Sequence, residues 1–582
     1  MKASHGIAIA GAGLVLTLPV LIFGIPFLSD DVGFHAVWYT HFSGQLWSGD
    51  FYPRWLAGMT GGLGSPVFFF YPPLPYFLTS MLKPFFRNDP QGLHQLGVSA
   101  SLALIASGWF TYLWLKNVVD ESAALTAAIL YMAMPYHLVA DLYARSSLAE
   151  YWAFVWMPLI LHFIHRLVSG HRLAFLGVAI GSALLITTHL PATLTFFVIP
   201  FCYLILFAPK KQRLKMLVIS LGAATLGVGL SAIYLLPAMT TQRFVLLDRM
   251  TTGYFSYENW LFFARFSLWK EDKITLALLT LDIIGLATCA FLIGRSSIDN
   301  KQKRMSCLLY GIAITSTFMM TEISKPVWLV LPVIRRLQFP WRFNAVLTLA
   351  TAGLLALAIS HLNQRRLFAT KTIAALLIIA WVPPTVSKAW RVFPHRNSDP
   401  QEISEREEEL RQNRDAPEYR PRWNAPMAAI DWEASVDEEL WARLMDKDIE
   451  SLLQRVGSSP EHSPEPKIIE GSGRAEITTR RPREIDLFVE ASTAVIVNVP
   501  QFYYPYWRAY LSGEGVDLSV APSRPDGLIN VAVPRGNHEV KLRLERSRPE
   551  LAGAIISVTS IAIALCLAVF LRRNRVNYGG ML

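Results

Sequence analysis

The sequence predicts a multi-span α-helical membrane protein of about 12 transmembrane helices with a C-terminal extracytoplasmic β-sandwich domain. Three observations predict this fold class. Hydrophobic residues make up 52% of the 582-residue chain and charged residues only 17%, which is too apolar for a soluble domain. Apolar runs long enough to cross a bilayer recur along the chain. One long polar block near the C-terminus alternates apolar and polar residues between turn signals, as antiparallel strands do.

About twelve runs have the length and composition of a spanning helix. They cover residues 6–28, 95–115, 123–140, 151–168, 172–188, 190–208, 216–236, 274–294, 306–320, 343–361, 371–387 and 551–571. The first run resembles a signal peptide, but it has no A-x-A-like cleavage site and carries only Lys2 in front of it. We therefore expect an uncleaved first helix.

Basic residues between these runs fix the expected orientation. With the N-terminus inside, Lys116, Arg166, Arg172 and the basic residues within 210–215, 295–304, 365–366 and 572–575 all face the cytoplasm. This holds only if the run at 67–86, "VFFFYPPLPYFLTSMLKPFF", does not span, and its prolines and aromatics suit an interfacial or re-entrant segment. Both termini are then cytoplasmic, in a bacterial inner membrane. The net charge of +10 reflects these loops, so we expect no nucleic-acid partner.

The polar block at 388–550 lies outside the membrane in this topology. A charged linker and helical region is expected at 388–474, with "EISEREEELRQNR" and the proline-rich "SSPEHSPEPK". A β-sandwich is expected at 475–548, where "REIDLFVEA", "TAVIVNVP" and "GLINVAVPRGNHEVKLRLE" are separated by turns. It follows a transmembrane core at 1–387 with an external loop at 29–94. A final helix and a cytoplasmic tail occupy 549–582.

Arginines in the external loops are the exception to the positive-inside pattern. They are Arg54, Arg145, Arg243, Arg249, Arg335, Arg336 and Arg342. Arginine binds phosphate through two parallel hydrogen bonds, so such residues suit a phosphate-bearing substrate. The alternative is contact with lipid headgroups or salt bridges within the loops. The candidate substrate-binding residues are Arg54, Arg145, His189, Arg335, Arg336 and Arg342.

Carboxylates gather in the same loops: Asp30, Asp31, Asp50, Asp141, Glu150 and Glu258. In acid/base or metal-assisted chemistry one carboxylate activates the acceptor and another binds a divalent ion. Asp30, Asp31 and Glu150 are the candidate catalytic residues. The alternative for the aspartate pair is a solvated turn at a helix end. Asp141 and Glu150 lie about two and a half helical turns apart, so they need not share a face.

A metal ion is a further expectation. His35 follows Asp31 by four residues, so both side chains can lie on one face of a helix and share a divalent ion, Mg, Mn or Zn. The alternative is a structural histidine at the membrane surface. The chain has no CxxC, HExxH or GxSxG pattern, and the glycine-rich "GMTGGLGSP" does not have the surroundings of a phosphate loop.

Several segments together resemble a known family. They are "SDDVGFH", "GDFYPRWLAGMTGGLGSPVFFFYPPLPYF", "DLYARSSLAEYW", "THLPATL", "YLLPA", "LQFPWRF" and the C-terminal "YYPYWRAYLSGEGV". The chain resembles the GT-C superfamily of integral membrane glycosyltransferases, and within it the "6-pyruvoyl-tetrahydropterin synthase-related" and YfhO-type membrane proteins. The resemblance implies sugar transfer from a polyprenyl-phosphate donor to an envelope glycan, lipid or protein acceptor at the outer face. The first-loop acidic residue of the family maps onto Asp30 or Asp31.

Two other classes of function remain open. A transporter or flippase of lipid-linked sugars would carry ionisable groups in mid-membrane, whereas most runs here are free of charge apart from Asp282 in "LTLDIIG". A non-catalytic envelope assembly factor would use the sandwich to bind a glycan or a protein. Loss of sugar transfer on replacement of Asp30 or Asp31 distinguishes an enzyme from a scaffold.

Overall fold

A computed structural model of the 582-residue chain describes residues 2–86, 88–263, 299–365, 416–424, 451–455, 464–513 and 515–573, with isolated positions between 286 and 407. The predicted runs at 274–294 and 371–387 lie outside the described residues, apart from isolated positions, as does most of the charged region at 388–474.

The membrane part is built from helices. Their bounds are α1 Ala3–Leu16, α2 Leu18–Phe23, α3 Val32–Trp47, α4 Val67–Phe70, α5 Leu74–Ser80, α6 Leu93–Leu115, α7 Glu121–Ala133, the π-helix η2 Tyr136–Arg145, α8 Leu148–Val168, α9 Ala174–Thr188, α10 Leu190–Phe196, α11 Ile199–Phe207, α12 Arg213–Leu230, α13 Ala232–Thr240, α15 Asn300–Met319, α16 Lys325–Val330, α17 Pro332–Arg335, the short η10 Pro340–Phe343, α18 Asn344–Arg365 and α23 Arg548–Arg573. Among the described residues, seven helical segments are long and apolar enough to cross a membrane.

The run at 67–86 is divided into short helices. It forms α4, α5 and a single turn at Lys83–Phe85, because Pro72 and Pro73 separate the first two and Pro84 is the second residue of the last. None of these pieces approaches the roughly 20 residues that a straight spanning helix requires.

The polar C-terminal block contains the predicted β-sandwich. Its strands are β1 Lys467–Glu470, β2 Gly473–Arg481, β3 Glu484–Ala491, β4 Val495–Phe502, β5 Trp507–Leu511, β6 Asp517–Leu518, β7 Val520–Pro522, β8 Leu528–Val533 and β9 Gly536–Leu544. They pair antiparallel in two sheets of order β1-β4-β8-β7 and β2-β3-β9-β5-β6. Alternate residues such as Ile485, Leu487 and Val489 of β3 are buried, as the sequence alternation requires.

The sandwich docks on the loop that follows α3. Leu63 O accepts a hydrogen bond from Phe502 N at 2.8 Å, and Gly62 O accepts one from Arg480 Nη1 at 2.7 Å. Gly64, at φ +86°, lies so close that an added Cβ would be 2.2 Å from Gln501 Nε2 and 2.6 Å from Trp55 Nε1. The glycine-rich segment is therefore a docking surface for the sandwich.

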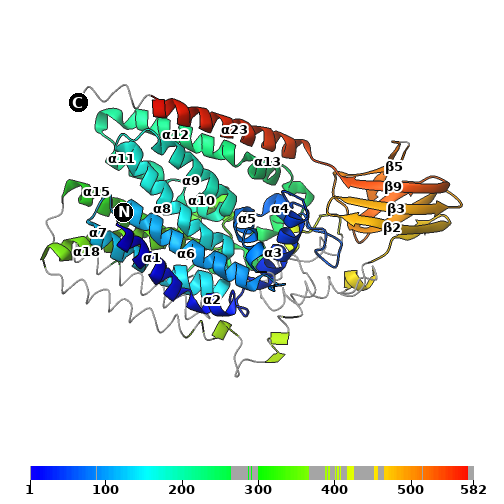
Figure 1. The fold of residues 1–582 in the computed structure, drawn as a ribbon, viewed down its shortest axis with the longest axis horizontal. Helices are drawn as coiled ribbons and strands as arrows, with labels where there is room; N and C mark the ends of the chain where they lie inside the picture. The colour runs from blue at the N-terminus through cyan, green and yellow to red at the C-terminus, as the bar shows by residue number, and fades with distance from the viewer. Residues whose placement is uncertain are drawn as a thin grey trace.

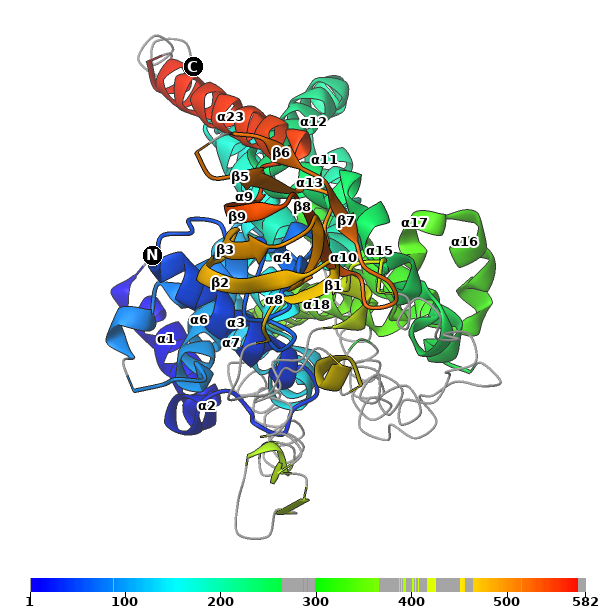
Figure 2. The same ribbon diagram turned by 90° about the vertical axis from the view of Figure 1, so that its right-hand side faces the viewer.

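Figure 1 shows the sandwich beyond one end of the helical core, and α23 returning along the core from it. α1 begins, and α23 ends, at the opposite end of the core. Figure 2 looks onto the sandwich, which covers the near end of the core. At the far end, Lys2 pairs with Glu121 at 3.4 Å, and Arg304 donates to Leu206 O at 3.3 Å, so loops distant in sequence meet there.

Candidate functional site

Arg145, the last residue of η2, lies at the centre of a cluster of carboxylates. Its Nη1 donates to Asp141 Oδ1 at 2.9 Å and to Glu150 Oε2 at 3.1 Å. Its Nη2 lies 3.5 Å from Asp31 Oδ2 and donates to Ser147 Oγ at 3.2 Å. One guanidinium thus connects three carboxylates from the start of α3, from η2 and from α8.

Glu150 brings a second arginine into this cluster. Arg342 Nε lies 3.8 Å from Glu150 Oε2, and Tyr136 donates its hydroxyl to Glu150 Oε1 at 2.8 Å. Arg342 is also held by Leu337 O at 2.6 Å and Gln338 Oε1 at 3.3 Å. The Asp141 and Glu150 side chains are 0% and 1% exposed, so the inner part of the network is buried. Three carboxylates face two guanidiniums, which leaves a formal charge of −1. We call these five residues the Arg145 cluster.

Asp31 is the accessible member of the Arg145 cluster. Its side chain is 36% exposed, and it occupies the position before the first turn of α3 without making a side-chain cap there. Its backbone N–H donates to Arg145 O at 2.8 Å, and that of Asp30 donates to Ala144 O at 3.1 Å. The aspartate pair is therefore tied to the end of η2, and the Asp31 carboxylate faces an arginine rather than solvating a turn.

The two histidines lie beside the cluster. His35 is 3% exposed, its Nδ1 is 2.6 Å from the Tyr76 hydroxyl, and it lies within electrostatic reach of Asp31 and Arg145. Burial lowers the pKa of His35 to about 4, against the opposing effect of the Asp31 carboxylate, so the ring is neutral at physiological pH. His189 is within electrostatic reach of Glu150, and its Nδ1 accepts from Ala192 N at 3.3 Å at the start of α10.

Asp31 and His35 are poorly placed to hold the predicted divalent ion. The Arg145 guanidinium already faces the Asp31 carboxylate at 3.5 Å, so a cation there would meet a like charge. Among the residues that the structure describes, no group of three or more His, Cys, Asp or Glu side chains could hold a metal ion. A divalent ion at Asp31 and His35 stays a prediction.

The chain between Asp141 and Glu150 brings both carboxylates to one guanidinium. η2 is a π-helix that ends at Arg145, and the next residue, Ser146, has a left-handed backbone with φ +55° and ψ +37°. Such conformations carry strain for residues other than glycine and concentrate at functional sites. The reversal at Ser146 lets α8 start beside η2, so Glu150 returns to Arg145.

Three predicted arginines lie elsewhere. Arg335 donates to the carbonyls of Trp328 and Leu329 at 2.9 Å each, at the end of α16, and Arg336 donates to Gln242 Oε1 at 2.8 Å. Arg54 is buried against Glu550, with Nη1 3.4 Å from Oε1, and Nη2 donates to Ile233 O at 2.8 Å. From the sequence, Asp141 is expected only among the loop carboxylates and Tyr136 not at all, yet Asp141 contacts Arg145 and Tyr136 contacts Glu150.

The fold and its helices define a membrane protein with a C-terminal β-sandwich. Residues 68–392, more than half of the chain, match the model of the family described as "6-pyruvoyl-tetrahydropterin synthase related domain; membrane protein". The chain belongs to this family, which confirms the family resemblance seen in the sequence. No curated protein matches the chain.

Two solved structures are similar to the chain. One is arabinofuranosyltransferase AftD from Mycobacteria, with 14% identity, a TM-score of 0.46, and coverage of 68% of this chain and 28% of that one. The other is the Archaeoglobus fulgidus oligosaccharyltransferase tethered to an acceptor peptide, with 14% identity, a TM-score of 0.35, and coverage of 70% and 59%. The chain thus spans less than two thirds of either protein. At TM-scores below 0.5 these similarities do not define the fold, and the proposals below rest on the chain's own residues.

Proposed function

We propose that the protein transfers a sugar from a polyprenyl-phosphate donor to an envelope glycan, lipid or protein acceptor at the outer face of a bacterial inner membrane. The observation that carries the proposal is the Asp31 carboxylate, which is partly exposed and backed by Arg145, whose side chain is only 15% exposed. Arg145, Glu150 and Arg342 each lie within three residues of the end of a candidate span. The Arg145 cluster is therefore at interface height, where a lipid-linked phosphate must sit.

In the proposed reaction, an acceptor hydroxyl oxygen attacks the anomeric carbon of the donor sugar, and the bond from that carbon to the phosphate oxygen breaks. Asp31 accepts the hydroxyl proton, and polyprenyl phosphate leaves. Arg145 and Arg342 stabilise the negative charge that develops on the leaving phosphate. The negative Asp31 carboxylate favours the oxocarbenium-like character of glycosyl transition states.

The buried members of the cluster have a supporting role in this proposal. Glu150 is 1% exposed, and its oxygens are engaged by Tyr136, Arg145 and Arg342. We therefore assign Glu150 to positioning the two arginines, although the sequence predicts it as catalytic. No step in the reaction passes through a metal ion.

An external site also requires the membrane topology that the sequence predicts, and we propose this topology for the protein. It has twelve spans, both termini cytoplasmic, and the sandwich outside. The contacts of Lys2 with Glu121, of Lys301 with Asn117 and of Arg304 with Leu206 gather basic loops and the N-terminus at the end away from the sandwich. The topology is tested by a single cysteine in place of the exposed residue Gln91, in a variant whose four native cysteines have been replaced by serine. Labelling by an impermeant thiol reagent in intact cells is expected, and labelling only after permeabilisation would contradict the topology.

A transporter reading has one observation in its favour. Asp141, Arg145, Glu150 and Arg342 belong to candidate spans, and intramembrane charges often mark a transport path. Three of the four lie at span ends, which suits an interfacial reaction better than passage through mid-membrane.

Sugar transfer is tested in a deletion strain carrying either the parent gene or the Asp31→Asn variant. Mass spectrometry of lipid-linked sugars and envelope glycans should show a donor that accumulates and a product that is lost in both the deletion strain and the variant. A variant that restores the full glycan profile would remove Asp31 from the reaction. Accumulation of donor on the cytoplasmic face alone would favour a flippase.

A further inference from the structure

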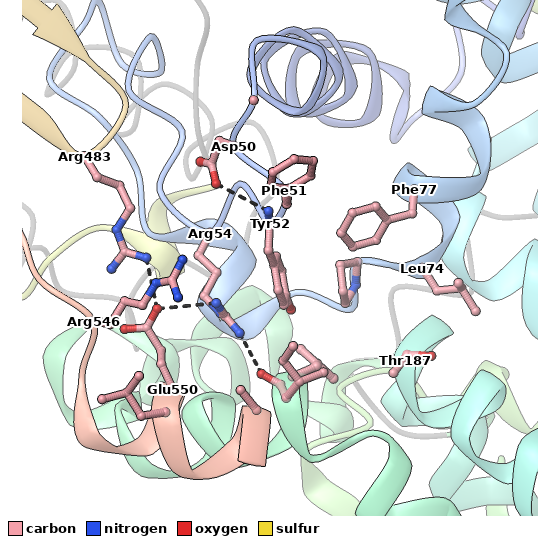
Figure 3. A pocket seen from close by; sticks show the side chains of 16 residues that line it. Asp50, Phe51, Tyr52, Arg54, Leu74, Phe77, Thr187, Arg483, Arg546 and Glu550 are labelled. Atoms are coloured by element: carbon pink, nitrogen blue, oxygen red, sulfur yellow. Dashed lines mark hydrogen bonds and ion pairs between the residues drawn. The ribbon is translucent and has the colours of Figure 1, made fainter. Parts of the chain in front are cut away.

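A second site lies at the junction between the helical core and the sandwich. A cavity of about 490 Å³ is formed there by the loop after α3, by α5, α9 and α13, by the turn between β2 and β3, and by the start of α23. Its volume is within the range of about 300–1,000 Å³ that small-molecule sites occupy. Figure 3 shows Arg54, Arg483, Arg546 and Glu550 together on one side, and Leu74 and Phe77 on the other. The lining of this junction cavity includes no member of the Arg145 cluster.

The charged side of the junction cavity has an excess of positive charge. Glu550 Oε1 accepts from Arg483 Nη1 at 3.1 Å and from Arg54 Nη1 at 3.4 Å. Among the residues that the structure describes, Arg546 has no hydrogen bond or ion pair. The three arginines face the carboxylates of Glu550 and Asp50, which leaves a formal charge of +1. Burial raises the pKa of Asp50, against the opposing effect of Arg483 and Arg54.

The Glu550 position is itself fixed by the start of α23. Ser547 Oγ accepts from Glu550 N at 3.2 Å, and Glu550 Oε2 accepts from Ser547 N at 2.8 Å, which is the reciprocal pairing of a capping box. Arg483 is held in turn by Leu544 O at 3.0 Å and Glu545 O at 3.1 Å. Arg54 and Arg483 therefore form a rigid wall, and Arg546 is the arginine left to bind a ligand.

The other side of the junction cavity is apolar. Leu74, Phe77, Ile233, Leu551 and Ala554 line it, and they come from α5, α13 and α23. Phe51, which also lines the cavity, is 85% exposed. Since the candidate span of α23 begins at Arg548, the cavity lies at the end of a span, at the height of the membrane surface. Its charged side faces the sandwich, and its apolar side lies among the membrane helices.

We propose that the junction cavity binds an anionic amphiphile, a lipid whose phosphate group contacts Arg546 between Arg54 and Arg483 and whose chains lie against Leu74, Phe77 and Ala554. Arginine and a phosphate form charge-assisted hydrogen bonds, and the apolar wall takes the first part of the chains. The ligand joins the loop after α3, the sandwich and α23, because each contributes to the cavity. The proposal stands whether or not the Arg145 cluster transfers sugar, since the two sites share no residue.

Binding is measured on the purified full-length chain in detergent, by native mass spectrometry with three probes. Dioleoyl phosphatidic acid carries the phosphate and the chains, dioleoyl phosphatidylcholine is a lipid without net charge, and inorganic phosphate is the free anion. The parent protein should prefer phosphatidic acid over phosphatidylcholine. Arg546→Gln should weaken phosphatidic acid binding about ten-fold or more, the effect of losing one charge-assisted bond. Arg546 is the right position because, within the described part of the chain, it has no partner to lose.

Two further variants sharpen the result. Arg535→Gln removes the same charge from an exposed position in the turn between β8 and β9, away from the junction cavity, and should bind as the parent does. Ala554→Phe fills the apolar side, so it should weaken phosphatidic acid binding and leave any weak binding of inorganic phosphate unchanged. Thermal melting of each variant checks that the fold is intact.

Three results would overturn the proposal. Equal binding of phosphatidic acid and phosphatidylcholine would mean that no anionic headgroup is recognised. Equal phosphatidic acid affinities of the parent and Arg546→Gln would remove the cavity as the site. Competition by inorganic phosphate at similar concentrations, with no effect of Ala554→Phe, would make it a site for a free anion.

Discussion

Replacement of Arg145 tests whether the Arg145 cluster is a functional network. Arg145→Gln leaves Asp31, Asp141 and Glu150 with Arg342 alone, and the formal charge falls from −1 to −2. Asp141 and Glu150 are almost fully buried, so removal of their shared partner leaves uncompensated buried charge. Breaking a buried pair in this way costs about 3–5 kcal/mol.

Asp31→Asn gives the contrasting case. The Asp31 side chain is 36% exposed and its ion pair with Arg145 is 3.5 Å long, so its loss should cost about 0–1 kcal/mol. Loss of a general base, by contrast, lowers the rate of transfer by about a hundred- to ten-thousand-fold. The structure thus predicts a variant that is stable and inactive beside one that is destabilised.

Thermal unfolding of the purified chain, followed by tryptophan fluorescence, measures the stability difference. An unfolding entropy of about 2.1 cal/mol/K per residue gives about 1.2 kcal/mol/K for a cooperative unit of 582 residues. The midpoint should then fall by about 2–4 °C in Arg145→Gln and by less than about 1 °C in Asp31→Asn. Arg336→Gln, an equal charge change at an exposed position, is the control.

The double variant Arg145→Gln with Asp141→Asn returns the formal charge to −1, and it should recover part of the lost stability. An Arg145→Gln protein as stable as the Arg336→Gln control would refute the buried-network reasoning. An Asp31→Asn protein that keeps full transfer activity would refute the role of Asp31.

Three further predictions concern single side chains. Arg342→Ala should raise the donor concentration needed for half-maximal transfer about ten- to a hundred-fold, because a charge-assisted bond to the donor phosphate is lost. Arg335→Ala and Arg336→Ala should leave this concentration unchanged. Equal effects in all three variants would contradict the placement of the donor. Gly64→Ala should loosen the contact between the sandwich and the core and expose the chain around it to protease. Gly49→Ala is the control, because Gly49 has φ +101° but no described atom lies within 4 Å of the added Cβ, so only backbone strain is expected. Equal proteolysis of the two variants would count against the docking contact. The pKa of His35 is lowered from 6.5 to about 4, so between these pH values the unfolded chain binds a proton that the folded chain does not. The contribution of His35 to stability is therefore complete above pH 6.5. The free energy of unfolding falls by up to about 3 kcal/mol as the pH drops from 6.5 to about 4. His35→Gln should reduce this fall in melting experiments, and an unchanged pH profile would contradict the burial argument.

Much of the fold could be predicted because its signals are local. Apolar length predicts helices such as α6 and α8, and alternation predicts strands such as β3 and β9. The prolines in the run at 67–86 predict the interruption between α4 and α5. These patterns depend on neighbours within one or two turns of the chain.

Long-range pairing was not predictable from the sequence. The sequence predicts Arg54 as a substrate-binding residue, yet its carboxylate partner Glu550 is 496 positions away. The capping box at Ser547 and Glu550 has a local signature, but nothing near it indicates Arg54. Arg335 also looked like a phosphate ligand, whereas it donates to the last carbonyls of α16, a place where cations stabilise a helix end.

The separation of Asp141 and Glu150 shows how one residue decides a site. Counted on a single α-helix, nine positions place the two carboxylates about two and a half turns apart, on opposite faces. The chain instead forms a π-helix up to Arg145, takes a left-handed step at Ser146 and begins α8 two residues later. That step turns α8 back beside η2, and Ser147 N then donates to Asp141 O at 2.9 Å while Arg145 reaches both carboxylates. A left-handed serine has no reliable sequence signal, because serine rarely adopts it without tertiary support. The short "ARSS" segment therefore determines the charge arrangement behind Asp31, and with it the chemistry proposed for the membrane surface.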